Sequence, residues 1–255
     1  MAHVMVVTSG KGGVGKTTVV SLLGRALANN GKKVALIDAD LGLKNLDVVM
    51  GLESRVVYDL EDIIKGRATI RQAIVQDKVC PTLFLLPACM RLEVAGVDEN
   101  YMTSIINQLQ NDFDYIIIDS PAGIEKGFFN AIKNAKTAIV VITLDKTSIR
   151  DSDKVIGLLK NQGISDIKLI INRVMKSNNQ LTLDEVNRIM DVPILGTIND
   201  DKEIQGLQNY GLAISKNGDT DIAFKNLANR LLGKEEVVKN KNSWFTRLIK
   251  LSSKS

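Results

Sequence analysis

A chain of 255 residues, 45% of them hydrophobic, is long enough to bury one full core as a single domain. Its net charge of +4 is unevenly distributed, because residues 239–255 carry five Lys or Arg residues and no acid, leaving residues 1–238 at −1 (4 − 5 = −1). Because residues 1–238 are close to neutral, they argue against a general nucleic-acid-binding surface on this part of the chain. Cys80 and Cys89 fit neither a CxxC motif nor a disulfide framework, and we expect reduced thiols. Strand-like sequence begins by His3 and apolar runs are short, so we expect neither a signal peptide nor a membrane span.

Short β-branched runs alternate with stretches of helical spacing along the chain. Strands are predicted at 3–8, 34–39, 83–87, 115–119, 138–143, 168–172 and 194–198. Helices are predicted at 17–30, 58–65, 69–76, 99–109, 125–134, 147–161, 183–190 and 220–232. Continuous apolar runs such as "YIIID" and "AIVVIT" favour strands covered on both faces. We therefore expect an α/β fold with a doubly wound, mostly parallel sheet over residues 1–232, a flexible polar linker at 233–242 and a separate C-terminal element at 243–255.

The stretch "GKGGVGKT" after the first strand matches the phosphate-loop template Gly-x-x-x-x-Gly-Lys-[Ser/Thr] at each required position. Glycines let successive backbone N–H groups converge on phosphate oxygens, and the following helix presents its positive end to them. Lys16 is expected to reach the β- and γ-phosphates, and the Thr17 hydroxyl to bind Mg²⁺. The predicted nucleotide-binding residues are Gly10, Lys11, Gly12, Gly13, Val14, Gly15, Lys16, Thr17 and Thr18. The alternative is a Gly-rich turn that meets the template by chance.

Three acids follow apolar strands of the predicted sheet. Asp38 and Asp40 end the run "ALIDAD", and Asp119 ends "YIIID" in the Walker-B form, a carboxylate held beside the magnesium shell. An acid at a strand end is often only a helix cap or a turn former. Three of them in a sheet with a phosphate loop predict a Mg²⁺ and nucleotide site instead.

A second lysine inside the loop, Lys11, marks a resemblance. The stretch "KGGVGKTT" resembles the deviant Walker A motif of the ParA/MinD superfamily of ATPases. The resemblance implies that Lys11 crosses a dimer interface to the phosphates of the partner's ATP, where a cation stabilises charge on the transferring phosphoryl group. Otherwise Lys11 is a solvated loop cation.

Further stretches resemble the division-site regulators of that superfamily: "LIDADLGLKNLDVVMGLE", "RVVYDL", "IIIDSPAGIE" and "SIRDSDKVIG". The resemblance implies a switch I at 38–45, where Asp40 positions or activates the attacking water, and a switch II at 119–123. Asp38 and Asp119 would act on Mg²⁺ through water. The resemblance also implies that the catalytic residues are Lys11, Lys16 and Asp40.

The same resemblance implies a dimer and partner surface and an adenine contact. The surface residues are Asn45, Ser148, Asp151 and Asp153, with Asp151 able to pair with a lysine of the loop. Asn172, at the end of "KLIIN", would meet the adenine edge. The chain departs from many relatives at Asn199, where they carry a proline, which leaves 199–201 open as adenine contacts.

Other classes share parts of this pattern. A ParA-type DNA-partition ATPase usually shows basic residues on the body, and an Fe–S scaffold ATPase needs closely spaced C-terminal cysteines. A flagellar-number regulator has a similar loop and stays open, as does a nucleotide-binding protein of unassigned role.

The segment "SWFTRLIKLSSKS" predicts an amphipathic helix. At about 100° per residue, its apolar residues fall within an arc of about 160°, and Arg247, Lys250 and Lys254 lie opposite. The proposed membrane contacts are Trp244, Phe245, Arg247, Leu248, Ile249, Lys250 and Leu251. Such a segment lies in the headgroup plane of a bilayer; the alternative is a last helix docked on the body. The segment also resembles the membrane-targeting sequence that ends proteins of this family.

Taken with the resemblance, the sequence predicts an ATPase that binds ATP and Mg²⁺, forms a homodimer and helps place the division septum. The implied partners are a MinC-like division inhibitor, a MinE-like activator and an anionic membrane surface, and no nucleic acid is expected. The implied location is the cytoplasm and the inner membrane, or the plastid stroma and inner envelope for a plastid-encoded chain.

Overall fold

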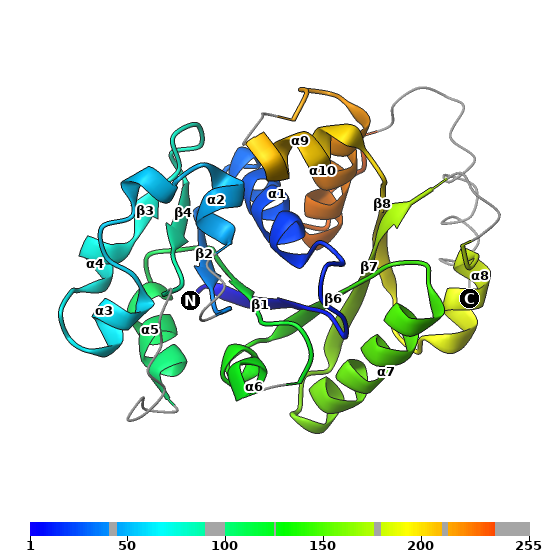
Figure 1. Cartoon of the computed structure of the whole chain (residues 1–255), viewed down its shortest axis with the longest axis horizontal. Helices are drawn as coiled ribbons and strands as arrows, with labels where there is room; N and C mark the ends of the chain where they lie inside the picture. Colours follow the sequence, from blue (N-terminus) through cyan, green and yellow to red (C-terminus); the bar gives the residue numbers. More distant parts are fainter. Residues whose placement is uncertain (41–44, 90–99, 125, 176–179, 211–213, 238–255) are drawn as a thin grey trace.

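One eight-stranded sheet, in the order β3-β4-β2-β5-β1-β6-β7-β8, organises the described residues (Figure 1). This computed structural model describes the chain except residues 41–44, 90–99, 125, 176–179, 211–213 and 238–255. The strands are β1 (His3–Thr8), β2 (Val34–Asp38), β3 (Val75–Gln76), β4 (Leu83–Leu86), β5 (Tyr115–Asp119), β6 (Thr137–Ile142), β7 (Asp166–Val174) and β8 (Ile194–Asn199). Neighbouring strands pair in parallel, except that β3 runs antiparallel to β4.

Helices cover both faces of the sheet (Figure 1). One face packs against α1 (Lys16–Asn29), α2 (Leu46–Met50), α9 (Lys202–Tyr210) and α10 (Asp219–Leu231). The other packs against α3 (Leu60–Ile64), α4 (Ile70–Ala73), α5 (Tyr101–Leu109), α6 (Lys126–Ile132), α7 (Lys146–Asn161) and α8 (Leu183–Ile189). Along β1, Val4 and Val6 enter one core, and Met5 and Val7 enter the other. Because successive side chains of a strand point to opposite faces, this double burial explains the continuous apolar runs.

The predicted doubly wound α/β fold is confirmed, and each of the seven predicted strands is present within two residues of its predicted ends. Sequence analysis missed β3, which lies inside the helix predicted at 69–76. In the structure α4 ends at Ala73, and the next residues pair with β4. It also missed α2, α9 and the 3-10 turn η1 (Glu53–Arg55).

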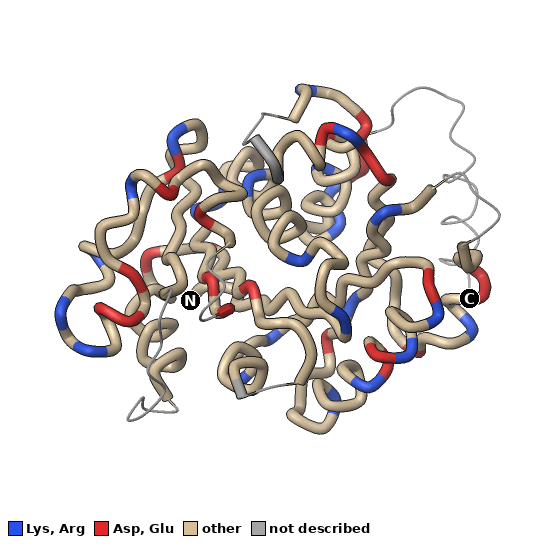
Figure 2. Tube along the Cα trace, viewed as in Figure 1, with Lys and Arg blue, Asp and Glu red and all other residues tan. Residues whose placement is uncertain are grey.

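The C-terminal predictions have different outcomes. Residues 233–237, expected to belong to a flexible linker, instead contact α10 through several hydrogen bonds. The predicted amphipathic helix at 243–255 lies outside the described residues. Among the helices that the structure describes, none has the length and apolar character needed to cross a bilayer. Acidic and basic residues are interspersed along the tube in Figure 2.

Candidate functional site

The phosphate loop joins β1 to α1 at the carboxyl edge of the sheet, and two of its glycines are required by their surroundings. Gly15 has φ 96°, in the left-handed region, and a Cβ there would lie 2.4 Å from Nδ2 of Asn172. A Cβ on Gly10 would lie 2.2 Å from the carbonyl carbon of Asp151. The loop is therefore pressed between the end of β7 on one side and the backbone of α7 on the other.

The ends of three neighbouring strands bring two of the predicted acids together beside this loop. Parallel register places Asp119 of β5 opposite both Val7 of β1 and Asp38 of β2. Asp119 is almost completely buried, and the Thr17 hydroxyl hydrogen-bonds its carboxylate. Its Oδ1 atom has no hydrogen-bond partner in the described part of the chain. Lys16, which begins α1, is also buried.

The two buried carboxylates have raised pKa values. Burial, followed by the charge of Asp119, raises the pKa of Asp38 to about 8. Three backbone N–H groups, those of Asp40, Asn45 and Leu46, donate to its oxygens at 3.1, 3.4 and 3.2 Å and partly offset the effect. Burial raises the pKa of Asp119 to about 6, against the opposing effects of Lys16 and Thr17. Holding both groups ionised in this site needs a further positive charge.

These residues fit a magnesium ion. Asp119 offers a buried oxygen without a partner, and hydroxyl and carboxylate oxygens are the ligands that Mg²⁺ prefers. Within the described ranges, no three His, Cys, Asp or Glu side chains form a cluster that could hold a metal by themselves. In nucleotide sites, Mg²⁺ usually keeps several waters and is bound through one or two carboxylates together with phosphates. Asp40, the predicted water-positioning residue, lies close enough for its charge to raise the pKa of Asp119.

Lys11 lies at the exposed side of the loop. Its Nζ atom is 3.3 Å from the Thr147 hydroxyl and 3.8 Å from the Asp145 carboxylate, and its side chain is 48% exposed. Sequence analysis predicted Asp151 as a partner for a loop lysine. In the structure the Asp151 carboxylate instead contacts Arg150 at 3.6 Å and Lys154 at 3.7 Å. Both residues lie on its own helix.

Asp145 is a site residue that sequence analysis missed. It caps α7 by accepting from the Ser148 N–H at 2.9 Å, and it also accepts from the hydroxyls of Thr143 and Thr147 at 2.6 Å each. Burial alone would raise the pKa of Asp145, but these hydrogen bonds lower it to about 2. The available signal was an acid just beyond the apolar run "AIVVIT", the pattern that revealed Asp119.

The predicted partner surface is only partly exposed. Asn45 and Asp153 are exposed and Asp151 is half-buried. Ser148 was predicted at this surface, but it is completely buried, and its Oγ atom accepts from the Thr143 N–H at 3.0 Å. The capped first turn of α7 directs it toward the end of β6, so Ser148 has no surface to offer a partner.

A cavity of about 730 Å³ extends from the loop along the ends of β6, β7 and β8 to α9. The predicted adenine contact, Asn172, lines it, but its Nδ2 atom donates to the Val14 carbonyl at 2.8 Å, so part of the amide supports the loop. Asn199, Asp200 and Asp201, left open by the sequence, line the same cavity. Arg173 lines it too, with φ 54°, and no sequence signal marked it.

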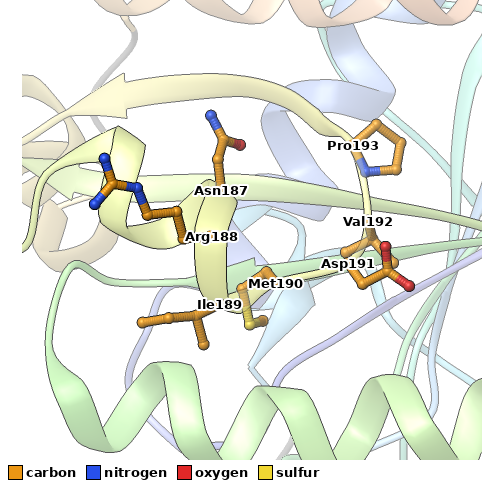
Figure 3. A pocket seen from close by; sticks show the side chains of 7 residues that line it. All are labelled: Asn187, Arg188, Ile189, Met190, Asp191, Val192 and Pro193. Atoms are coloured by element: carbon orange, nitrogen blue, oxygen red, sulfur yellow. The ribbon is translucent and has the colours of Figure 1, made fainter.

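A second hollow, of about 360 Å³, lies between the end of α8 and the start of β8 (Figure 3). One continuous run, Asn187–Pro193, lines it, and the labelled side chains diverge in Figure 3. Since a binding site needs converging polar groups, the larger cavity beside the phosphate loop is the candidate site.

Comparisons with known proteins agree with this geometry. Residues 5–214 match the model of the CobQ/CobB/MinD/ParA nucleotide binding domain. The chain is 46% identical over 248 residues to the septum site-determining protein MinD of Thermotoga maritima, covering 94% of this chain and 92% of that protein. It resembles MinD in the MinC:MinD complex of Aquifex aeolicus, with TM-score 0.85, 40% identity, and coverage of 94% and 99%.

A third match is MinD of Pyrococcus horikoshii complexed with Mg-ADP, with TM-score 0.83, 30% identity, and coverage of 91% of this chain and 96% of that one. The named relatives favour the division-site regulators over the partition, Fe–S scaffold and flagellar classes. The chain therefore belongs to the MinD family of septum site-determining ATPases, within the CobQ/CobB/MinD/ParA nucleotide-binding proteins.

Proposed function

We propose that this MinD-family ATPase couples ATP-dependent pairing of two chains to residence on an anionic membrane, and so helps place the division septum. The observation that carries the proposal is Lys11, a cation on the phosphate loop whose Nζ atom has only exposed contacts, with Asp145 at the N-cap of α7 and Thr147 in its first turn. An exposed contact of this kind contributes little, typically under about 1 kcal/mol, so a partner's phosphates can compete for the lysine.

The residues of one chain have separate roles in this proposal. The loop N–H groups and Lys16 hold the phosphates, and Thr17, Asp38 and Asp119 hold Mg²⁺, the two acids through water. An ion held there would supply positive charge against the phosphates and against the repulsion between the two acids. Asp40 orients the attacking water, and Lys11 of the paired chain stabilises charge on the transferred phosphoryl group.

The proposed protein partners contact the exposed residues beside the loop. The solved Aquifex complex is of MinD with MinC, and we extend a MinC-like partner to this chain. Asn45 and the exposed face of α7, with Asp153, are the candidate contacts. A MinE-like protein would stimulate hydrolysis and so separate the pair.

The tail at 243–255 is proposed as the membrane contact. Its basic residues would each gain about 1 kcal/mol near an anionic surface, and its apolar face would add to this. One such anchor binds weakly, whereas two on a dimer gain about 10²–10⁴ in avidity. The ATPase would then be peripheral on the cytoplasmic side of the inner membrane, or at the plastid inner envelope.

Sedimentation with anionic liposomes tests the proposal. The chain should pellet with ATP and Mg²⁺, and stay largely in the supernatant with ADP. Deleting residues 243–255 should abolish pelleting but leave ATP-dependent dimers in ultracentrifugation. Equal pelleting in ATP and ADP, or liposome binding by the truncated chain, would contradict the tail as a nucleotide-gated anchor.

A further inference from the structure

The chain turns back on itself after α10. Gly233 has φ 64°, and its N–H donates to the Arg230 carbonyl at 3.3 Å. The next N–H, of Lys234, donates to the Asn229 carbonyl at 2.8 Å. This left-handed turn ends the helix and reverses the direction of the chain. Residues 234–237 consequently run back beside the helix they have just left.

Three side chains of α10 hold this returning segment. Asn226 pairs with the backbone of Val237 in both directions, donating to its carbonyl at 3.1 Å and accepting from its N–H at 2.7 Å. Asn229 donates to the Glu235 carbonyl at 2.8 Å. Because positions separated by three and four residues share one helix face, Asn226, Asn229 and Arg230 form a single docking surface.

Arg230 makes the strongest of these contacts and also ties the surface to the sheet. Its guanidinium binds both carboxylate oxygens of Glu236, at 2.8 and 3.0 Å, and donates to the carbonyl of Leu195 in β8. A bidentate pair of this kind fixes orientation as well as distance. Gly196 provides the room, since a Cβ there would lie 2.6 Å from Nη1 of Arg230.

The direction of the returning segment matters because α10 runs antiparallel to the strands. At the start of α10, the Thr220 hydroxyl donates to the Asp201 carboxylate. Asp201 lies just beyond the carboxyl end of β8 and lines the larger cavity beside the phosphate loop. Near the end of α10, Arg230 contacts Leu195 at the beginning of β8. The helix therefore runs away from the carboxyl edge of the sheet, where the phosphate loop lies, and residues 234–237 run back toward that edge.

We infer that this face of α10 is a docking site for the chain's own residues 234–237, and that docking fixes Val237 as the point on the folded domain from which the C-terminal tail is tethered; we call this second part the launching role. The launching role rests on the proposed function, in which the tail is a membrane anchor. The turn at Gly233 and the four docked residues 234–237 together take up five of the ten residues of the predicted linker 233–242. Effective concentration falls roughly as the −3/2 power of tether length, so releasing them should lower the avidity of a paired tail about threefold.

The double variant Asn226→Ala/Glu236→Gln tests the inference in the full-length chain. It removes both hydrogen bonds to Val237 and the charge of the Glu236 pair, and alanine is well tolerated in a helix. Glu235→Gln is the matched control, because it makes the same change in charge while the Glu235 backbone carbonyl that accepts from Asn229 is kept.

Two measurements separate docking from membrane binding. Hydrogen exchange at the Val237 amide should be slow in the wild type and in Glu235→Gln, and fast in the double variant. A liposome titration in ATP should then require more anionic lipid for half-binding by the double variant than by the control, up to about threefold, at the same melting temperature.

Each outcome bears on a different step. Rapid exchange of the wild-type Val237 amide overturns the docking site itself. If the Val237 amide of the double variant exchanges rapidly while its lipid affinity equals that of the control, the launching role is overturned. A wild type with a protected amide that fails to pellet in ATP refutes the membrane proposal, and the launching role with it, while the docking site stands.

Discussion

Replacing Asp38 with asparagine tests whether the two carboxylates at the ends of β2 and β5 destabilise the nucleotide-free fold. Burial and the neighbouring Asp119 raise the pKa of Asp38 to about 8. Between pH values of about 4 and 8, the folded chain therefore keeps a proton that the unfolded chain releases. Since the folded state binds more protons across this window, its stability falls as pH rises. An asparagine side chain cannot ionise, so Asp38→Asn should lack that part of the fall.

The magnitude follows from the size of the window. Each pH unit contributes at most about 1.4 kcal/mol, so the gain of Asp38→Asn approaches an upper limit of about 4 kcal/mol at pH 7. The asparagine amide oxygen can still accept from the backbone N–H groups of Asn45 and Leu46, which share Oδ2 of Asp38, but the amide nitrogen then faces the Asp40 N–H that donates to Oδ1. The loss of that hydrogen bond costs about 1–3 kcal/mol at every pH, so it offsets the gain without changing its pH dependence.

Urea unfolding with EDTA and without nucleotide, from about pH 5 to pH 8, measures the free energy of unfolding of both proteins. The difference should grow with pH and level off near pH 8. The exposed substitution Asp153→Asn serves as the control for loss of a surface carboxylate. A difference of the same size at every pH would refute the reasoning.

Three further predictions concern the loop and switch I. Lys11→Ala should keep nucleotide binding through Lys16 but lose ATP-dependent pairing in ultracentrifugation; a fully dimeric variant would exclude the contact across the interface. Asp40→Ala should bind ATP yet release phosphate about 10²–10⁴-fold more slowly, and wild-type turnover would remove Asp40 from the mechanism. Gly15→Ala should weaken ATP binding by about 1–3 kcal/mol in a fluorescent-nucleotide titration, because the new methyl group meets Asn172 at 2.4 Å; unchanged affinity would contradict this contact.

Sequence was sufficient where local chemistry determines the structure. Apolar runs of parallel strands and the glycine spacing of the loop predicted the sheet and placed Lys16 at its carboxyl edge. Asp38 and Asp119 could be expected to meet, because parallel strand ends share one edge, and the register pairs them directly.

Sequence was insufficient where contacts between distant segments decide. The strand β3 exists through pairing with β4, so the helical spacing before it misled the prediction. The resemblance placed Ser148 at the partner surface, but its side chain is completely buried and accepts from the N–H of Thr143 just beyond β6. Residues 233–242 are mostly polar and therefore suggested a linker, and the partners of residues 235–237 on α10 are polar side chains that hydrophobic patterning does not register.

The antiparallel strand β3 has a consequence for solubility. A sheet edge exposes unpaired N–H and C=O groups, which can recruit a strand from another molecule and start aggregation. β3 closes the β4 edge with only two residues, and the carbonyl of Gln76 accepts from Arg55 at 3.0 Å. A short strand whose carbonyl is bound by a charged side chain is a poor template for another chain. This border of the sheet therefore protects the ATPase from edge-to-edge association with other molecules.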